Sequence, residues 1–437
     1  MKTDTVWRPV QYLGNKLRVL EQVRAACTRG LDSSDRIWDA FSGSSVVSQE
    51  IGAAGHPVYS TDVLATSIVL ARALMGIGRT DSSLEAASSE VAARANKMRS
   101  EIWDRAVEQE RAAIASADGD SLAQLGRSLP QRWRRDGASA TQLKAFDQVD
   151  EDARAERLTV AGQMATTYAG TYFGVEQAVR LDALRGAIFS LERDGAIDGW
   201  QCAAMLTALS FAASRSVHSA GKHFAQPLKL AATPFHRRRL LSDRALIVDD
   251  AFMAGLAEIE RSARPPGEHH VVELAEAERV DGSRLRELGV RSVYADPPYT
   301  AQQYSRFYHV LDVLVSGAPA ILQRRGDRVT TGLYPVDRHR SRFCSRTQAP
   351  AAFAELAHHV RDAGARLVVS YSVSDHASVG NARSIGLDPL LDLLRETFGS
   401  RGVHMEEVDI RYRQFNSGGL SSPTRNDPEV LIVAEPS

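Results

Sequence analysis

Short apolar runs alternate with helix-like segments at both ends of the chain. Strands are expected where apolar, β-branched and aromatic residues are bounded by turn-forming residues, at residues 36–41, 57–61, 270–273, 292–295 and 366–371. Helices are expected where apolar residues recur at helical spacing, at residues 46–54, 64–75, 304–315, 350–363 and 387–398. The alternation predicts an α/β fold with a parallel sheet. Two final runs, 403–411 and 429–434, predict an antiparallel pair of strands.

The middle of the chain has a different pattern. Strand-forming runs disappear after residue 80, and amphipathic helices are expected at residues 173–191, 199–214 and 242–264. The helical pattern ends at the Pro-Pro-Gly sequence of residues 265–267. We therefore predict an α/β domain formed by residues 1–80 and 268–437, split by a helical insertion of residues 81–267.

Length and composition agree with a soluble protein of two such parts. The chain has 437 residues, more than one ordinary core needs, and its 24% charged and 43% hydrophobic residues are typical of globular proteins. Cys27, Cys202 and Cys344 have no CxxC neighbour, so we expect neither a disulfide framework nor a metal site. No apolar run approaches the roughly 18 residues of a membrane span. We expect a cytoplasmic protein with no membrane partner.

The net charge of −1 conceals two basic stretches. Residues 201–248 hold seven Lys and Arg against one acid, and residues 322–346 hold seven Arg against two acids. A solvated surface would explain such stretches, and so would a surface that binds a phosphate backbone. Charge alone leaves both interpretations open.

The sequence Asp296-Pro297-Pro298-Tyr299 directly follows the strand expected at 292–295. Two prolines fix a stiff turn at the carboxyl end of that strand, where open α/β sheets bind ligands. The carboxylate and a backbone carbonyl can accept both N–H bonds of a planar amine while the Tyr299 ring stacks on it. We favour this function over a simple capping turn.

A glycine-containing turn follows the first expected strand. Gly43 would let the backbone approach a ligand, and Asp39 could accept hydrogen bonds from its amino group. The second strand ends in Asp62, at the spacing of about 20 residues typical of a carboxylate that binds ribose hydroxyls. Asp62 could instead cap the next helix. The two features in this order favour binding of a nucleoside cofactor.

Taken together, these motifs resemble those of amino-group DNA methyltransferases that use S-adenosylmethionine, specifically the adenine-N6 D12 class of Dam-like enzymes. The order matches the α arrangement, in which the target-recognition region lies between the cofactor motifs and the catalytic motif. The resemblance covers residues 10–74 and 271–434. It implies a Rossmann-like class I methyltransferase sheet of seven strands with a reversed last strand. The insertion, residues 81–267, would be a large, mostly helical target-recognition domain.

The resemblance also implies roles for individual residues. Asp296, Pro297, Pro298 and Tyr299 match the catalytic motif. Residues that match cofactor-binding motifs are Tyr12, Gly14, Lys16, Asp39, Phe41, Gly43 and Asp62. Glu276 stands where the family usually has Asp to meet the cofactor's adenine. Ser45 replaces a usual glycine in the cofactor-binding turn, where a serine can still cap the following helix.

Phosphate contacts are expected from basic residues near the loop at 218–227, which resembles a loop near the DNA-binding surface of related adenine methylases. The candidates are Arg215, Lys222, His223, Arg237, Arg238, Arg239 and, after the catalytic motif, Arg306.

The expected function is site-specific methyl transfer to N6 of an adenine flipped out of DNA, in a restriction-modification or phage-defence context. A cognate restriction endonuclease or other defence proteins would be partners, and the protein would act at the nucleoid. The alternatives are methylation of RNA adenine or of cytosine N4 in DNA, and an inactive DNA-binding scaffold on the same fold. Adenine and cytosine are not distinguished by the Asp-Pro-Pro-Tyr motif alone.

Overall fold

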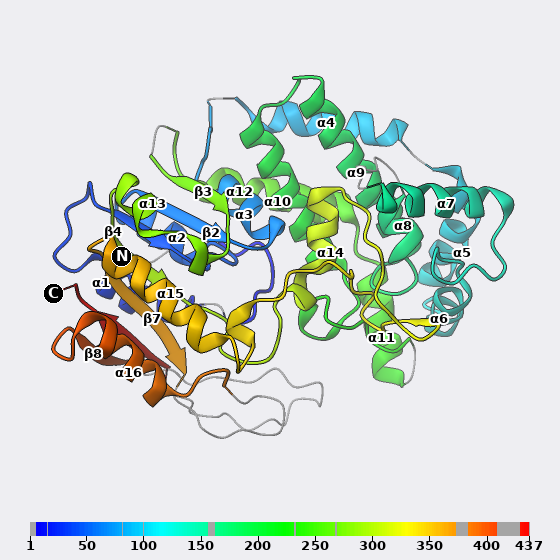
Figure 1. Ribbon diagram of the computed structural model, residues 1–437. Coiled ribbons are helices and arrows are strands. Elements are labelled where there is room, and N and C mark those ends of the chain that lie inside the picture. The colour runs from blue at the N-terminus through cyan, green and yellow to red at the C-terminus, as the bar shows by residue number, and fades with distance from the viewer. Residues whose placement is uncertain are drawn as a thin grey trace.

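The computed structural model describes residues 6–436, except residues 15, 81, 99, 156–161, 231–232, 267–268, 373–382 and 409–428. Its centre is a seven-stranded sheet beside a group of helices (Figure 1). The strands are β1 (Arg36–Asp39), β2 (Val58–Asp62), β3 (Val271–Leu274), β4 (Val290–Ala295), β7 (Arg366–Ser372), β8 (Val403–Val408) and β9 (Glu429–Ala434).

The strand order in the sheet is β3-β2-β1-β4-β7-β9-β8. The pairs β3–β2, β2–β1, β1–β4 and β4–β7 are parallel, whereas β9 runs antiparallel to both β7 and β8. The predicted α/β fold, the mostly parallel seven-stranded sheet and the reversed last strand are confirmed. β8 ends at Val408, and the last residues of the strand expected at 403–411 lie outside the described part of the chain.

Consecutive side chains of the central strands enter two different apolar layers. On β1, Ile37 packs in one layer and Trp38 in the other, and on β7 Val368 and Val369 do the same. Both faces of the sheet are therefore buried, which is why these strands appear in the sequence as nearly continuous apolar runs.

Helices cover both faces of the sheet. α1 (Leu20–Thr28) and α2 (Val46–Ala53) pack in the layer of Ile37. α13 (Gly282–Glu287), α15 (Ala349–Asp362) and α16 (Leu387–Phe398) pack in the layer of Trp38. α1 is an additional helix that the sequence pattern did not indicate.

The described residues between β2 and β3 form helices joined by loops and contribute no strand to the sheet. After α3 (Ala65–Leu74) these are α4 (Leu84–Lys97), α5 (Asp104–Ala115), α6 (Gly119–Ser128), α7 (Ala140–Arg154), α8 (Gln163–Thr167), α9 (Val175–Arg193), α10 (Gly199–Ser216), α11 (Pro234–Arg244) and α12 (Val248–Ser262). Their largest apolar core also includes side chains of α3 and of α14 (Ser305–Ser316). The core shared by these helices fixes the insertion against the helix that follows the Asp-Pro-Pro-Tyr turn.

The single helix expected at 242–264 is wrong, because α11 ends at Arg244 and α12 starts at Val248. The carbonyls freed at this break are satisfied from another helix. Gln177 Nε2 on α9 donates to the carbonyls of Asp243 and Leu246 at 2.8 and 3.0 Å. A long-range partner of this kind leaves no periodic signal in the sequence.

The remaining elements are short. They are a two-stranded hairpin, β5 (Arg324–Arg325) and β6 (Arg328–Val329), and the 3₁₀ turns η1 (Glu101–Trp103), η2 (Ala220–Lys222), η3 (Ala277–Arg279) and η4 (Arg342–Cys344). Within the described ranges, no helix is both long and apolar enough to cross a membrane.

Candidate functional site

Three predicted site segments meet at the carboxyl edge of the sheet. Asp296 follows β4, Asp39 ends β1, and Asp62 ends β2. β1 pairs with both β4 and β2, so these three carboxylates come from neighbouring strands. The structure thus places the segments predicted to be catalytic and cofactor-binding along one edge of the sheet, which is where parallel sheets bind ligands.

Asp296 forms a buried ion-pair cluster with two residues far away in the chain. Lys16 Nζ lies 3.1 Å from Asp296 Oδ1 and 2.5 Å from Glu429 Oε1. The side chains of Lys16 and Glu429 are 3% and 2% exposed, whereas that of Asp296 is 21% exposed and can be reached by a substrate. Burial raises the pKa of Asp296 to about 6, with Lys16 acting to lower it and Glu429 to raise it.

Lys16 remains charged in this cluster. Burial lowers its pKa, but the charges of Asp296 and Glu429 more than offset that effect, and the pKa lies well above its usual value. Glu429 was missed at the level of sequence. The available signal was an acidic residue at the start of the otherwise apolar strand β9.

The aromatic ring of the catalytic motif is fixed from two sides. The Tyr299 ring lies 5.6 Å from the ring of Tyr371 on β7, and the guanidinium of Arg383 lies 4.6 Å from its centre. The backbone N–H of Ser384 donates to the Tyr299 carbonyl at 3.0 Å. These contacts hold Tyr299 next to Asp296 through the segment that follows β7.

The turn after β1 packs closely against the N-terminal segment. Gly43 has a φ of +51°, and a Cβ there would lie 2.8 Å from the Tyr12 ring, so only glycine fits. The Phe41 ring packs edge-on against Phe343 at 5.2 Å. Ser45 precedes α2 in the left-handed conformation and makes no side-chain capping bond. The cap that a serine could form here is not made, because φ of +61° turns Ser45 away from capping geometry.

The two acids that end β1 and β2 are both buried. Ser48 Oγ donates to Asp39 Oδ2 at 2.6 Å, and Oδ1 has no hydrogen-bond partner among the described residues. Burial raises the pKa of Asp39 to about 7, despite the bond from Ser48. Asp62 accepts the backbone N–H groups of Gly43 and Leu64, each at 2.9 Å. Asp62 therefore fixes the turn after β1 and also holds the backbone at Leu64, just before the helix that starts at Ala65.

The N-terminal motif lies on the helix that follows the catalytic turn. The rings of Tyr12 and Tyr308 stack at 4.5 Å, and the hydroxyl of Tyr308 accepts the Leu13 N–H at 2.8 Å. Gly14 has a φ of +69°, and a Cβ there would lie 3.3 Å from the Tyr304 hydroxyl. Residues 12–14 thus pack directly against Tyr304 and Tyr308, almost 300 positions away in the chain.

Glu276 lies at the same edge of the sheet, directly after β3. The backbone N–H of the preceding Ala275 donates to the Asp62 carbonyl at 3.0 Å. The Glu276 carboxylate pairs with Arg279 and lies 3.3 Å from His339 Nε2. Within the described residues, no group of three His, Cys, Asp or Glu side chains could hold a metal ion.

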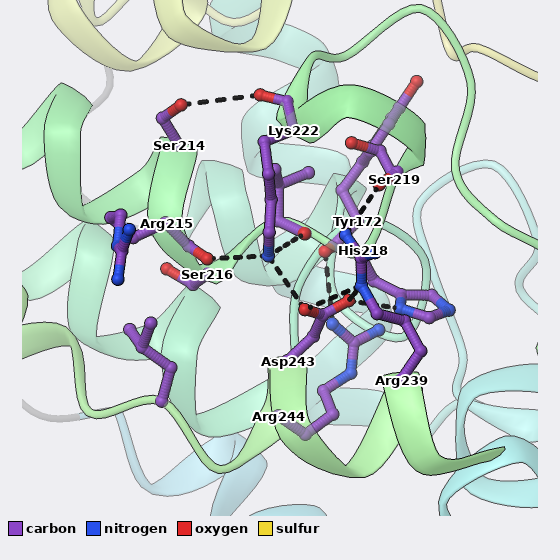
Figure 2. A network of polar contacts seen from close by, with 12 residues as sticks. Tyr172, Ser214, Arg215, Ser216, His218, Ser219, Lys222, Arg239, Asp243 and Arg244 are labelled. Carbon is purple, nitrogen blue, oxygen red and sulfur yellow. Dashed lines mark hydrogen bonds and ion pairs between the residues drawn. The ribbon is translucent and has the colours of Figure 1, made fainter. Parts of the chain in front are cut away.

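Two of the predicted DNA-binding side chains point into a network around Asp243 (Figure 2). Lys222 Nζ donates to Asp243 and to the carbonyls of Arg215 and Val217, at 2.8 to 2.9 Å. Arg239 Nε donates to the same carboxylate at 3.1 Å, and His218 Nδ1 lies 2.8 Å from it. Burial raises the pKa of Asp243, but the bonds from His218 and Lys222 outweigh it and lower the pKa overall. The network fastens the 218–227 loop to α10 and α11.

The other predicted DNA-binding residues lie outside that network. Arg237 and Arg238 are exposed on α11, and Arg237 pairs with Asp120 at 2.8 Å. The His223 ring contacts Phe307 edge-on at 4.9 Å. Arg306 Nη2 donates to the hydroxyl of Tyr334 at 3.0 Å. Among these residues, the α11 arginines are the best placed to meet a large external ligand.

Comparison with known proteins supports a specific family. Residues 12–184 match the model of the D12 class N6 adenine-specific DNA methyltransferase family. The chain is also 28% identical over 149 residues to Modification methylase LlaI of Lactococcus lactis subsp. lactis. That alignment covers 34% of this chain, and the chain spans 21% of the relative's length. These matches show that residues 12–184 of this chain are similar to the D12 class N6 adenine-specific DNA methyltransferase family.

Proposed function

We propose that this protein transfers a methyl group from S-adenosylmethionine to N6 of a flipped-out adenine in DNA. The observation that carries the proposal is the Asp-Pro-Pro-Tyr turn on β4, which shares one sheet edge with the turn after β1 and with Asp62. We further propose that the sheet is a class I methyltransferase sheet and that residues 81–267 form the target-recognition domain. The strand order and the family match support both proposals.

The residues at the turn after β1 fit the cofactor of this family. Buried oxygens of Asp39, Ser42 and Ser45 have no hydrogen-bond partner within the described residues, which is typical of a site built for a polar ligand. Gly43 keeps the turn free of a side chain. We propose that Tyr12, Gly14, Asp39, Phe41, Gly43, Ser45, Asp62 and Glu276 surround S-adenosylmethionine. When bound, the cofactor supplies an electrophilic methyl group.

The chain's own residues prepare the amine. Asp296 and the Pro297 carbonyl accept the two N–H bonds of the N6 amino group, while the Tyr299 ring stacks on the base. Because both N–H bonds are engaged, the nitrogen lone pair stays free and points away from the two acceptors. Pro298 stiffens the turn that presents all three groups.

DNA would bind along the arginine-bearing elements outside the sheet. α11 exposes Arg237 and Arg238, and the β5–β6 hairpin exposes Arg324, Arg325 and Arg328. The relative is named a modification methylase, so we propose that this protein also acts at specific sites in a restriction-modification or phage-defence context. A cognate restriction endonuclease or other defence proteins would then be its partners, at the nucleoid.

The salt dependence of DNA binding separates the exposed arginines from the internal network. Replacing Arg237 and Arg238 by Ala should weaken binding and reduce the slope of log K against log salt by about 1.8, because each phosphate contact contributes about 0.9. Fluorescence anisotropy with a labelled duplex at several salt concentrations measures this slope. Lys222→Met is the control. It should lower the free energy of unfolding by about 1–3 kcal/mol and leave the slope unchanged. A reduced slope for Lys222→Met, together with an unchanged slope for the variant that lacks Arg237 and Arg238, would instead indicate that Lys222 contacts DNA.

The proposed reaction can be tested in cells. Modification-sensitive sequencing of DNA from a host expressing the chain reports the modified base, its position and its context together. We expect N6-methyladenine at defined sites with the wild-type chain and none with Asp296→Ala. Methylated cytosine at those sites, or an unmodified genome despite folded protein, would overturn the proposal.

A further inference from the structure

Glu429 is a buried acid that the reaction described so far does not use. It is the first residue of β9, opposite Ser372 on β7 and Val408 on β8. Its carboxylate lies 2.5 Å from Lys16 Nζ and also accepts a hydrogen bond from the hydroxyl of Ser370. The reversed strand thus delivers an acid to the same edge where the parallel strands end.

The cluster contains one cation for two acids. Among the described residues, Lys16 bridges Asp296 and Glu429, and with both carboxylates ionised these three side chains together carry a charge of −1. Within the described part of the chain, the titratable groups that interact with this cluster include Tyr294, Tyr299, Tyr304 and Asp39, with Arg383 beyond Tyr299. Burial raises the pKa values of all three tyrosines, so their hydroxyls stay neutral.

Methyl transfer leaves a proton to be removed. The N6 lone pair forms the new N–C bond, the bond between methyl carbon and sulfur breaks, and its electron pair stays on sulfur. The positive charge therefore moves to the nitrogen, which must lose one proton to give the neutral methylamino product. Asp296, which already accepts an N–H bond from this nitrogen in the proposed function, is the adjacent acceptor.

We propose that Glu429 is a positioning residue that keeps Lys16 paired while Asp296 takes this proton. The inference rests on the proposed function. Protonation of Asp296 removes one of the two negative partners of the Lys16 ammonium. With Glu429 present, the cluster becomes a neutral acid beside a neutral ion pair. Without Glu429, the same step would leave a buried cation with no counter-charge, which is strongly unfavourable.

The electrostatics of the cluster agree with this role. Burial is the largest effect that raises the pKa of Asp296, Lys16 opposes it, and Glu429 adds to it. The value of about 6 makes Asp296 ionised at neutral pH and yet more basic than an ordinary aspartate. Removing the charge of Glu429 should therefore make Asp296 a weaker proton acceptor.

Substitutions at Glu429 separate charge from packing. Glu429→Gln keeps the size and loses the charge, Glu429→Asp keeps the charge and loses a methylene, and Glu429→Ser is a second neutral variant if Gln does not fold. Single-turnover methyl transfer to plasmid DNA that the wild type modifies should fall about 10- to 100-fold in the neutral variants. Glu429→Asp should stay within about fivefold of wild type. A packing role predicts the opposite order, with Gln better than Asp.

The second readout needs neither cofactor nor DNA. In protein labelled with ¹³C at the aspartate carboxyl carbon, the Asp296 resonance is assigned by its loss in Asp296→Asn, and its titration is followed by NMR. The midpoint should drop by about one pH unit or more in Glu429→Gln. The acid limb of the rate profile should move to lower pH in parallel. Glu110→Gln, a buried acid that accepts two backbone N–H groups at the start of α9, should change neither.

Each result bears on one proposal. An unmoved Asp296 midpoint, or a Glu429→Gln enzyme at least as fast as Glu429→Asp, would overturn the role of Glu429. A wild-type chain that methylates no DNA would overturn the proposed function instead, and the NMR titration would still test the cluster.

Discussion

Asp296→Ala is expected to lower the single-turnover rate of methyl transfer to DNA by about 10³-fold. In the proposed reaction, the Asp296 carboxylate accepts an N–H bond of the amine and later its proton, and alanine can do neither. Quenched-flow incorporation of labelled methyl groups measures the rate, and binding of S-adenosylmethionine should remain close to wild type.

Asp392→Ala is a matched control for this experiment. Asp392 is an exposed acid on α16, one of the helices that cover a face of the sheet, and its side chain lies near Arg395 of the same helix. The single-turnover rate of Asp392→Ala should equal that of the wild type. Equal rates for Asp296→Ala and Asp392→Ala would show that the catalytic turn has another function.

Lys16→Met should be the most destabilising single change at the site. It removes the cation that pairs with both Asp296 and Glu429, so each carboxylate loses its ion pair with Lys16. We expect the free energy of unfolding at pH 8 to fall by about 3 kcal/mol. Urea unfolding followed by tryptophan fluorescence measures it, with the exposed Lys229→Met as a control that should change little.

The stability that Lys16→Met loses should be larger at high pH than at low pH. Without Lys16, burial raises the folded-state pKa of Asp296 above its unfolded value. Stability is then highest below the unfolded pKa of about 4 and falls as the pH rises through the folded pKa. Lys16→Met should therefore recover part of its lost stability at pH 5. A variant equally unstable at both values would indicate a packing defect rather than a charge defect.

The sequence was most informative where a local pattern determines local structure. Buried strands are apolar on both faces, and prolines and glycines mark their turns, so the positions of Asp296, Gly43 and Asp62 at one edge could be predicted. The reversed strand β9 was also indicated by its apolar run, although its pairing between β7 and β8 depends on residues far away in the chain.

Features that depend on long-range contacts were not predictable. Glu429 joins Lys16 across more than 400 residues, and Asp243 gathers Lys222, His218 and Arg239, so that two predicted phosphate ligands lie in a network that holds a loop. The break between α11 and α12 is supported by Gln177 from α9. A charged side chain looks the same in the sequence whether it meets DNA or a buried partner.

The most direct test of the proposed chemistry is to incubate unmethylated duplex DNA with purified protein and methyl-labelled S-adenosylmethionine, then digest the DNA and separate its nucleosides. We expect label in N6-methyl-2′-deoxyadenosine, with none for Asp296→Ala. Label in N4-methylcytosine, or label only when RNA replaces DNA, would contradict an adenine-specific DNA methyltransferase.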